Sequence, residues 1–276
     1  MNLSPLLPDE DFRHSMRFSK GTLSGYYGAT NDHAELIGQR SRWIAEQPSR
    51  YAAMSAGCEA MLDEATSLAN DVGGIDGETI DRISKERDPM MRCQLLGAHW
   101  EPDFLLMKST DAGLPRLLGG CVCFPSHWSL EEKLGKSMDS IHSPVPNLNA
   151  DLGRQINGFL NRIKPGISWE RTNWGLAAAS DLNLHPALSP PRLHDEVVAG
   201  DVWLRIEWQS LVALPVSKGI LFGIRLQIMP LLTVIQDAGA TQRLHRALAT
   251  MPDEMAHYKG LGECRERLLR LLDPEG

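Results

Sequence analysis

Two segments decide the fold: VWLRIEWQSLVAL at residues 202–214 and GILFGIRLQIM at residues 219–229. Both are rich in the β-branched and aromatic residues that strands favour, and only a short Pro-Val-Ser-Lys turn separates them. Together they predict a long antiparallel β-hairpin.

Side chains alternate between the two faces of a strand, so Arg205, Glu207 and Gln209 share one face of the first segment. In the second segment Arg225 and Gln227 lie on the face opposite the apolar row that runs from Ile220 to Ile228. If the two polar rows share a face, they form a cluster that could be the wall of a ligand pocket, where arginines suit bidentate carboxylate binding. The alternative is a solvated outer face with cross-strand ion pairs.

Working outward from the hairpin, further strands are predicted at residues 103–109, 117–124 and 167–176. Helical spacing of apolar residues predicts two helices between residues 32 and 68, and the second of them includes Met54. Further helices are predicted at residues 77–98, at residues 149–163 and in the last ~40 residues. Ser129 and Glu132 predict a capping box for a short helix at residues 129–135. Residues 1–30 are expected to form an extended arm. The pattern is that of an α+β protein, an antiparallel sheet with helices packed on it.

The composition indicates which kinds of binding partner and which cellular compartment to expect. A net charge of −7 argues against nucleic acid as the main partner. No apolar run is long enough to span a membrane, no secretory signal is recognisable, and the odd number of cysteines, five, fits reduced thiols. We therefore expect a cytoplasmic protein. Cys121 and Cys123 lack a second ligand pair for zinc.

Of the nine histidines, His142 has the most restricted setting. It precedes Pro144 and Pro146, whose fixed φ angles hold the backbone, so its imidazole could be presented rigidly to a metal or ligand. A core histidine bonded to a carbonyl is the alternative.

The stretch from Cys123 to Pro146, CFPSHWSLEEKLGKSMDSIHSPVP, resembles a family signature. The pattern F-P-x-x-W-x-L-x-x-K-x-G followed by I-H-x-P-V-P is typical of the haem-dependent oxidative N-demethylase α-subunit family. Further matches are Arg171-Thr-Asn173-Trp174, the Arg205-x-Glu207-x-Gln209 strand and Ile224-Arg225.

The resemblance implies a single haem-binding, PAS-like domain over residues 1–276, with a helical part to about residue 100, a sheet core of about five strands over 101–231 and a helical tail. It also implies haem b as cofactor and oxygen-dependent N-demethylation of a small secondary amine such as dimethylamine. Electrons would come from separate flavin and iron–sulfur reductase subunits that use NADPH. A non-catalytic haem-binding sensor, or a family member that has lost the haem, are the alternatives.

Within this resemblance the site residues take expected roles. His142 is the expected axial ligand of the haem iron. Cations are expected to pair with the haem propionates; the candidates are Lys133, Arg171, Arg205 and Arg225. Glu207 could bind the protonated amine or relay protons, or instead pair with an arginine, while Asn173 and Gln209 would orient it by hydrogen bonding.

Overall fold

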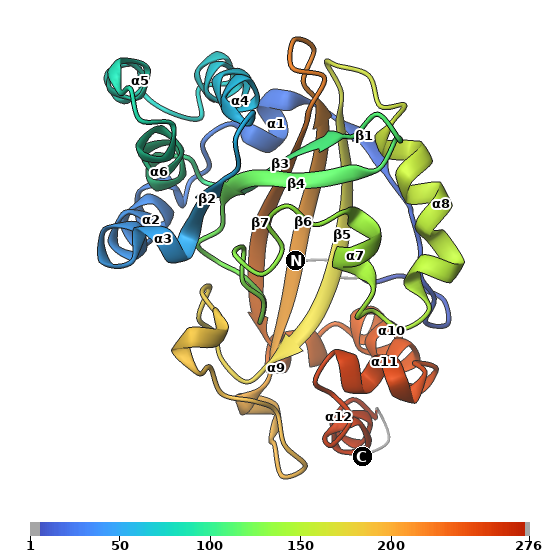
Figure 1. Cartoon of the computed structure of the whole chain (residues 1–276). Coiled ribbons are helices and arrows are strands. Elements are labelled where there is room, and N and C mark those ends of the chain that lie inside the picture. The colour runs from blue at the N-terminus through green and yellow to red at the C-terminus, as the bar shows by residue number, and fades with distance from the viewer. Residues whose placement is uncertain (1–5, 274–276) are drawn as a thin grey trace.

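A computed structural model describes residues 6–273, and in this range seven strands form one antiparallel sheet in the order β1-β5-β6-β7-β3-β4-β2 (Figure 1). The strands in chain order are β1 Ser19–Gly21, β2 Ala52–Met54, β3 Asp103–Ser109, β4 Pro115–Cys121, β5 Ser168–Ala177, β6 Trp203–Ala213 and β7 Ile220–Pro230. The predicted hairpin is confirmed as β6 and β7, which pair along their whole length. The α+β class is therefore confirmed.

Helices surround the sheet in three groups. The first group is α1 Leu23–Tyr27, α2 His33–Glu46, α3 Pro48–Tyr51, α4 Glu59–Asp71, α5 Gly77–Lys85 and α6 Pro89–His99; the second is α7 Met138–His142 and α8 Leu148–Leu160; the third is α9 Leu231–Ile235, α10 Ala238–Ala249, α11 Asp253–Tyr258 and α12 Arg265–Leu271. In Figure 1, α2 and α6 lie on one side of the sheet, α8 on the other, and α10 to α12 at its lower end. No helix within residues 6–273 has the length and apolar character needed to cross a membrane.

Each helical group buries its own part of the sheet. Helices of the first group pack with Phe104, Leu106, Val212 and Leu221. The tail helices pack on the other end of that face, around Leu204 and other residues of β5 and β6. Helix α8 packs on the opposite face. Both ends of β6 are buried, whereas its middle, from Glu207 to Gln209, is only partly covered and carries polar side chains.

The expected sheet of about five strands is wrong in number. Five long strands are present, and β1 and β2 add one short strand to each edge. Each edge strand has three residues and pairs with one neighbour, β1 with β5 and β2 with β4. A segment of three residues is too short to show an alternating pattern, so neither was predicted.

Three local predictions are also corrected. Met54 lies in β2 rather than in a helix. The helix expected at residues 77–98 is divided by Asp88 and Pro89, which start α6. Residues 131–135 form a turn, and the buried Ser129 hydroxyl has no hydrogen-bond partner among residues 6–273, so the predicted capping box does not form.

Candidate functional site

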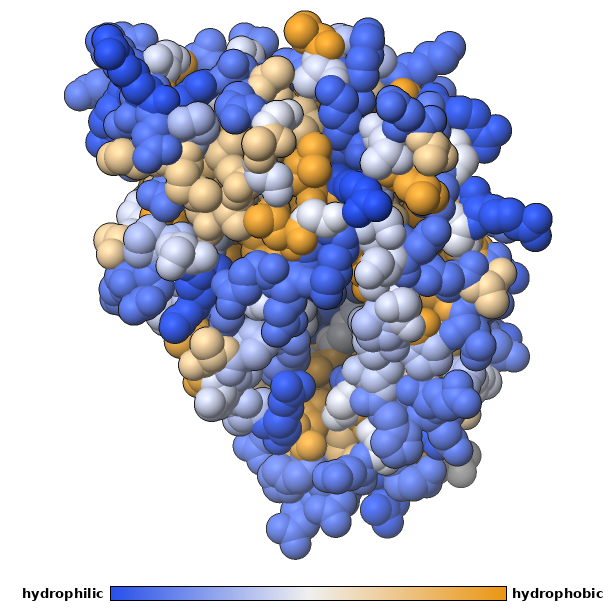
Figure 2. All heavy atoms as spheres, in the orientation of Figure 1, coloured by the Kyte–Doolittle hydropathy of each residue, from blue (hydrophilic) through white to orange (hydrophobic). Residues whose placement is uncertain are grey.

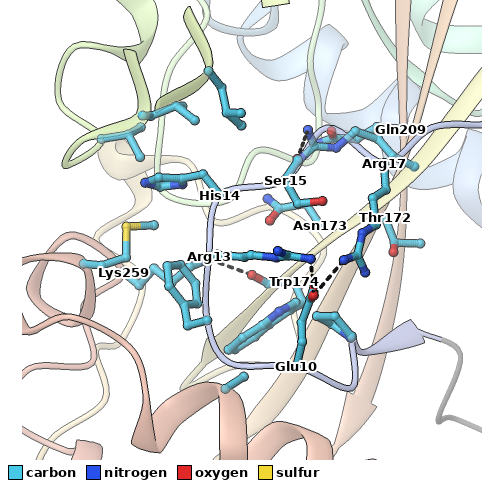
Figure 3. Close-up of a pocket in the computed structure, with 18 of the residues that line it drawn as sticks. Glu10, Arg13, His14, Ser15, Arg17, Thr172, Asn173, Trp174, Gln209 and Lys259 are labelled. Atoms are coloured by element: carbon cyan, nitrogen blue, oxygen red, sulfur yellow. Dashed lines mark hydrogen bonds and ion pairs between the residues drawn. The ribbon is translucent and has the colours of Figure 1, made fainter. Parts of the chain in front are cut away.

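A cavity of about 550 Å³ lies beside the open edge of β5, within the size range of small-ligand pockets. Most of its lining comes from the arm formed by residues 6–17, the α7–α8 region, β5 and the end of α11, and single residues of β6, β7 and α10 complete it. Figure 3 shows the arm crossing in front of β5, with Arg13 and Arg17 both directed at Glu10. Figure 2 shows polar residues over most of one face of the molecule, with apolar atoms inside a hollow below its middle.

One wall of the cavity is apolar. Leu148, Leu152 and Ile156 recur every fourth residue along α8, so they project from one side of this helix into the cavity. Val145 and Phe222 extend the apolar surface. This wall could cover a hydrophobic ligand.

His142 is the last residue of α7 and lines the cavity. Ser137 caps this helix, because its hydroxyl accepts a hydrogen bond from the Ser140 N–H and so fixes where the helix begins. The imidazole is half-buried and makes no side-chain hydrogen bond within residues 6–273. Burial, and then the nearby Arg171 charge, lower the pKa of His142 to about 4. The ring is therefore neutral near pH 7 and can act as a metal ligand.

This lowered pKa predicts a pH-dependent stability. An unfolded histidine takes up its proton at about pH 6.5, whereas folded His142 does so near 4. The unfolded state therefore binds more protons in this window, so the free energy of unfolding should rise as pH rises from about 4 to about 6.5. In urea titrations, His142→Asn should have a shallower rise over that window than the unchanged protein. Equal slopes for the two proteins would show that His142 is not responsible.

Arg171, Asn173, Glu207 and Gln209 form a polar row next to the cavity. Arg171 pairs with Gln209, and Asn173 with Glu207, across β5 and β6, so all four side chains leave the same face. The Glu207 Oε2 atom accepts hydrogen bonds from Asn173 Nδ2 at 3.3 Å and Gln209 Nε2 at 2.9 Å. Arg171, Asn173 and Gln209 line the cavity, and Glu207 lies directly behind them.

Arg171 is a half-buried cation whose only hydrogen bond within residues 6–273 is a long one. Its Nη1 donates to the Ser15 carbonyl at 3.4 Å, and its guanidinium lies 5.8 Å from the Phe18 ring centre. Burial lowers the pKa of Arg171, and the Glu207 charge partly opposes this. Most of its N–H groups remain available for an anion in the cavity.

Arg225 does not share the face of Glu207, so the condition that the two polar rows share a face is not met. Arg225 pairs with Trp208, whose side chain leaves the opposite face of β6. On that face Arg225 forms an ion pair with the buried Glu101, and its Nη2 donates a hydrogen bond to the Gly28 carbonyl at 2.7 Å.

Arg205 and Lys133 also lie away from the lining of the cavity. Arg205 is buried and donates to the carbonyls of Asp181 at 2.6 Å and Leu182 at 2.9 Å, where burial lowers its pKa to about 10. Lys133 lies 5.8 Å from the Trp128 ring centre. Arg205 therefore holds the loop at residues 181–182.

Lys259 and the arm also line the cavity, which their sequence does not predict. Lys259 follows α11 and lines the cavity; its Nζ donates to the Trp174 carbonyl at 2.8 Å and lies 5.1 Å from the Trp174 ring centre (Figure 3). His14, on the arm, lines the cavity while its Nε2 contacts the Pro146 carbonyl at 2.8 Å. Neither residue stands in a recognisable motif, because both reach the cavity only through tertiary folding.

No group of three or more His, Cys, Asp and Glu side chains that could hold a bare metal ion occurs within the described part of the chain. The cavity instead offers two imidazoles, of His142 and His14, several cations and an apolar helix face. Fold and cavity together define an α+β protein with an amphipathic pocket beside β5.

A comparison with protein families agrees with this class. The family model described as "Haem-dependent oxidative N-demethylase, alpha subunit-like" matches residues 44–269. The chain belongs to this family, which confirms the resemblance seen in the sequence. The match includes His142, β5 to β7 and Lys259, but not the arm at residues 6–17.

Proposed function

We propose that the chain binds b-type haem in the cavity beside β5, with His142 as an axial ligand of the iron. The observation that carries this proposal is the half-buried His142 imidazole, which lines the cavity without a hydrogen-bond partner in residues 6–273. The apolar wall from α8 fits the hydrophobic faces of a porphyrin, and Arg171 fits the need of a propionate for a cation. Of the cations expected to meet propionates, Arg171 is the one that lines this cavity.

The order of the long strands supports a PAS-like sheet. Taken in chain order, the five long strands lie in the sheet as second, first, fifth, fourth and third. The first and last of them are therefore neighbours in the middle, and all neighbouring pairs are antiparallel.

For activity, we propose oxygen-dependent removal of a methyl group from a small secondary amine such as dimethylamine. The family match to an oxidative N-demethylase subunit supports the reaction class. Separate reductase subunits with flavin and an iron–sulfur centre would deliver electrons from NADPH. The bound haem would supply oxygen activation, while this chain binds and orients the reactants.

Glu207 is the candidate group for the amine. An alkylammonium needs a negative partner in a partly apolar site, and Glu207 lies on the sheet face next to the cavity. Asn173 and Gln209 both donate to its Oε2 atom, so its orientation is fixed while Oε1 remains without a hydrogen-bond donor in residues 6–273. Oε1 could therefore accept a proton or an N–H group of the substrate.

The visible spectrum tests the cofactor. Protein produced with adequate haem should show a Soret band, and its absence would refute the haem proposal.

Formaldehyde release from dimethylamine, with a reductase supplied, tests the reaction. A Soret band without formaldehyde from any small methylamine would favour a non-catalytic haem protein.

The substitution Glu207→Gln distinguishes a loss of catalytic activity from a loss of haem binding. The amide keeps the shape of the side chain but loses its charge and its basicity, so formaldehyde release should fall by about 100-fold, while the Soret band is unchanged. Asp181→Asn, which leaves the backbone carbonyl used by Arg205 in place, is the control and should retain activity. An active Glu207→Gln protein would exclude Glu207 from the reaction.

A further inference from the structure

Two cations approach the cavity from different elements. Arg171 comes from the open edge of β5, and Lys259 from the segment after α11. Each is close enough to Glu207 to be influenced by its charge, and Arg171 also acts on Lys259. Two neighbouring cations in a partly dehydrated site repel each other unless an anion lies between them.

Neither cation has a carboxylate partner in the described part of the chain. No Asp or Glu oxygen of residues 6–273 lies within 4.0 Å of the charged nitrogens of Arg171 or Lys259. Glu207 uses Oε2 for Asn173 and Gln209 instead.

The other cavity-lining arginines differ in this respect. Arg13 and Arg17, both on the arm, contact Glu10 at 2.5 and 2.6 Å. Among the arginines and lysines that line the cavity, only Arg171 and Lys259 therefore lack a carboxylate partner in residues 6–273.

Both cations keep hydrogen-bond donors for a ligand. The Lys259 ammonium has three N–H groups and uses one for the Trp174 carbonyl. Arg171 uses one N–H for a 3.4 Å contact with the Ser15 carbonyl. Packing against the Trp174 and Phe18 rings holds both side chains in place without neutralising their charge.

We propose that Arg171 and Lys259 together form the anchor for one carboxylate of the cofactor, at the junction of β5 and α11. This assignment rests on the proposed haem function and adds to it a residue from the helical tail. The sheet would then supply one half of the carboxylate site and the tail the other half.

The test compares haem with its dimethyl ester, in which both carboxylates are esterified. Absorbance titrations of the purified chain would measure the affinity for each porphyrin. Lys259→Met keeps a flexible apolar side chain over Trp174 but removes the charge. This variant should bind haem about tenfold more weakly, because a charge-assisted hydrogen bond is lost, and bind the ester as the unchanged protein does. Arg171→Met should show the same selectivity, and Lys259→Arg should restore most of the haem affinity.

Arg13→Met is the matched control, since it removes a cavity-lining cation that already has Glu10 as its partner. Its affinities for haem and ester should change by the same factor. Equal weakening of haem and ester by Lys259→Met would overturn the anchor while leaving haem binding intact. If the unchanged protein binds neither porphyrin, the proposed function fails and the anchor fails with it.

Discussion

Replacing His142 with alanine is expected to abolish the Soret band of the haem-loaded protein or to shift it. The imidazole lines the cavity, is neutral at pH 7 because of its lowered pKa, and has no competing side-chain hydrogen bond in the described chain. Alanine removes the imidazole that α7 would offer to the iron. Visible spectroscopy of both proteins, purified after growth with the same haem supply, checks the result.

Two controls separate ligation from folding. His14→Ala removes a second cavity-lining imidazole, one that contacts the Pro146 carbonyl, and should leave the Soret position unchanged. Free imidazole added to His142→Ala should restore the band if only the ligand was lost. An unchanged spectrum in His142→Ala would refute the assignment of this residue.

Asp103→Ala is expected to destabilise the fold by about 3–5 kcal/mol, because it leaves a buried charge without its partner. Arg40 and Asp103 are 0% and 2% exposed, and Arg40 Nη1 lies 2.6 Å from Asp103 Oδ1. Asp103 also accepts the backbone N–H groups of Cys123 at 2.7 Å and Phe124 at 3.0 Å. The substitution would therefore remove the link between α2, β3 and the start of the signature segment.

Urea unfolding at pH 7 measures this loss. Asp63→Ala breaks a more exposed ion pair with Arg92 and should cost less than about 1 kcal/mol. Similar losses in the two variants would show that the buried pair contributes no more than the surface pair.

The long elements were predictable because their patterns are long. The β6–β7 hairpin, β3, β5 and α8 each extend over seven or more residues with a consistent apolar pattern. The edge strands β1 and β2 have three residues each, and they form because β5 and β4 offer open edges. Such pairing depends on the assembled sheet, so local sequence does not report it.

The site was predictable where residues share one strand or one turn. Arg171 and Asn173, and Glu207 and Gln209, alternate along their strands, and the structure brings them together. Arg225 was misplaced because the register of a hairpin sets which rows share a face. In this hairpin odd-numbered residues of β6 pair with even-numbered residues of β7, so Arg225 meets Trp208 instead of an odd-numbered polar residue.

The arm has a consequence for how a ligand enters. Leu7 is buried among the tail helices, but the rest of the arm near the cavity is held largely by polar contacts with partly exposed groups, such as Asp11 with Arg246 and the Phe12 N–H with Thr250. Releasing these contacts costs little beside breaking a strand of the sheet, so we expect the arm to open more readily than β5. Hydrogen exchange of the arm amides should therefore report the rate at which the cavity admits its ligand, independently of the stability of the sheet.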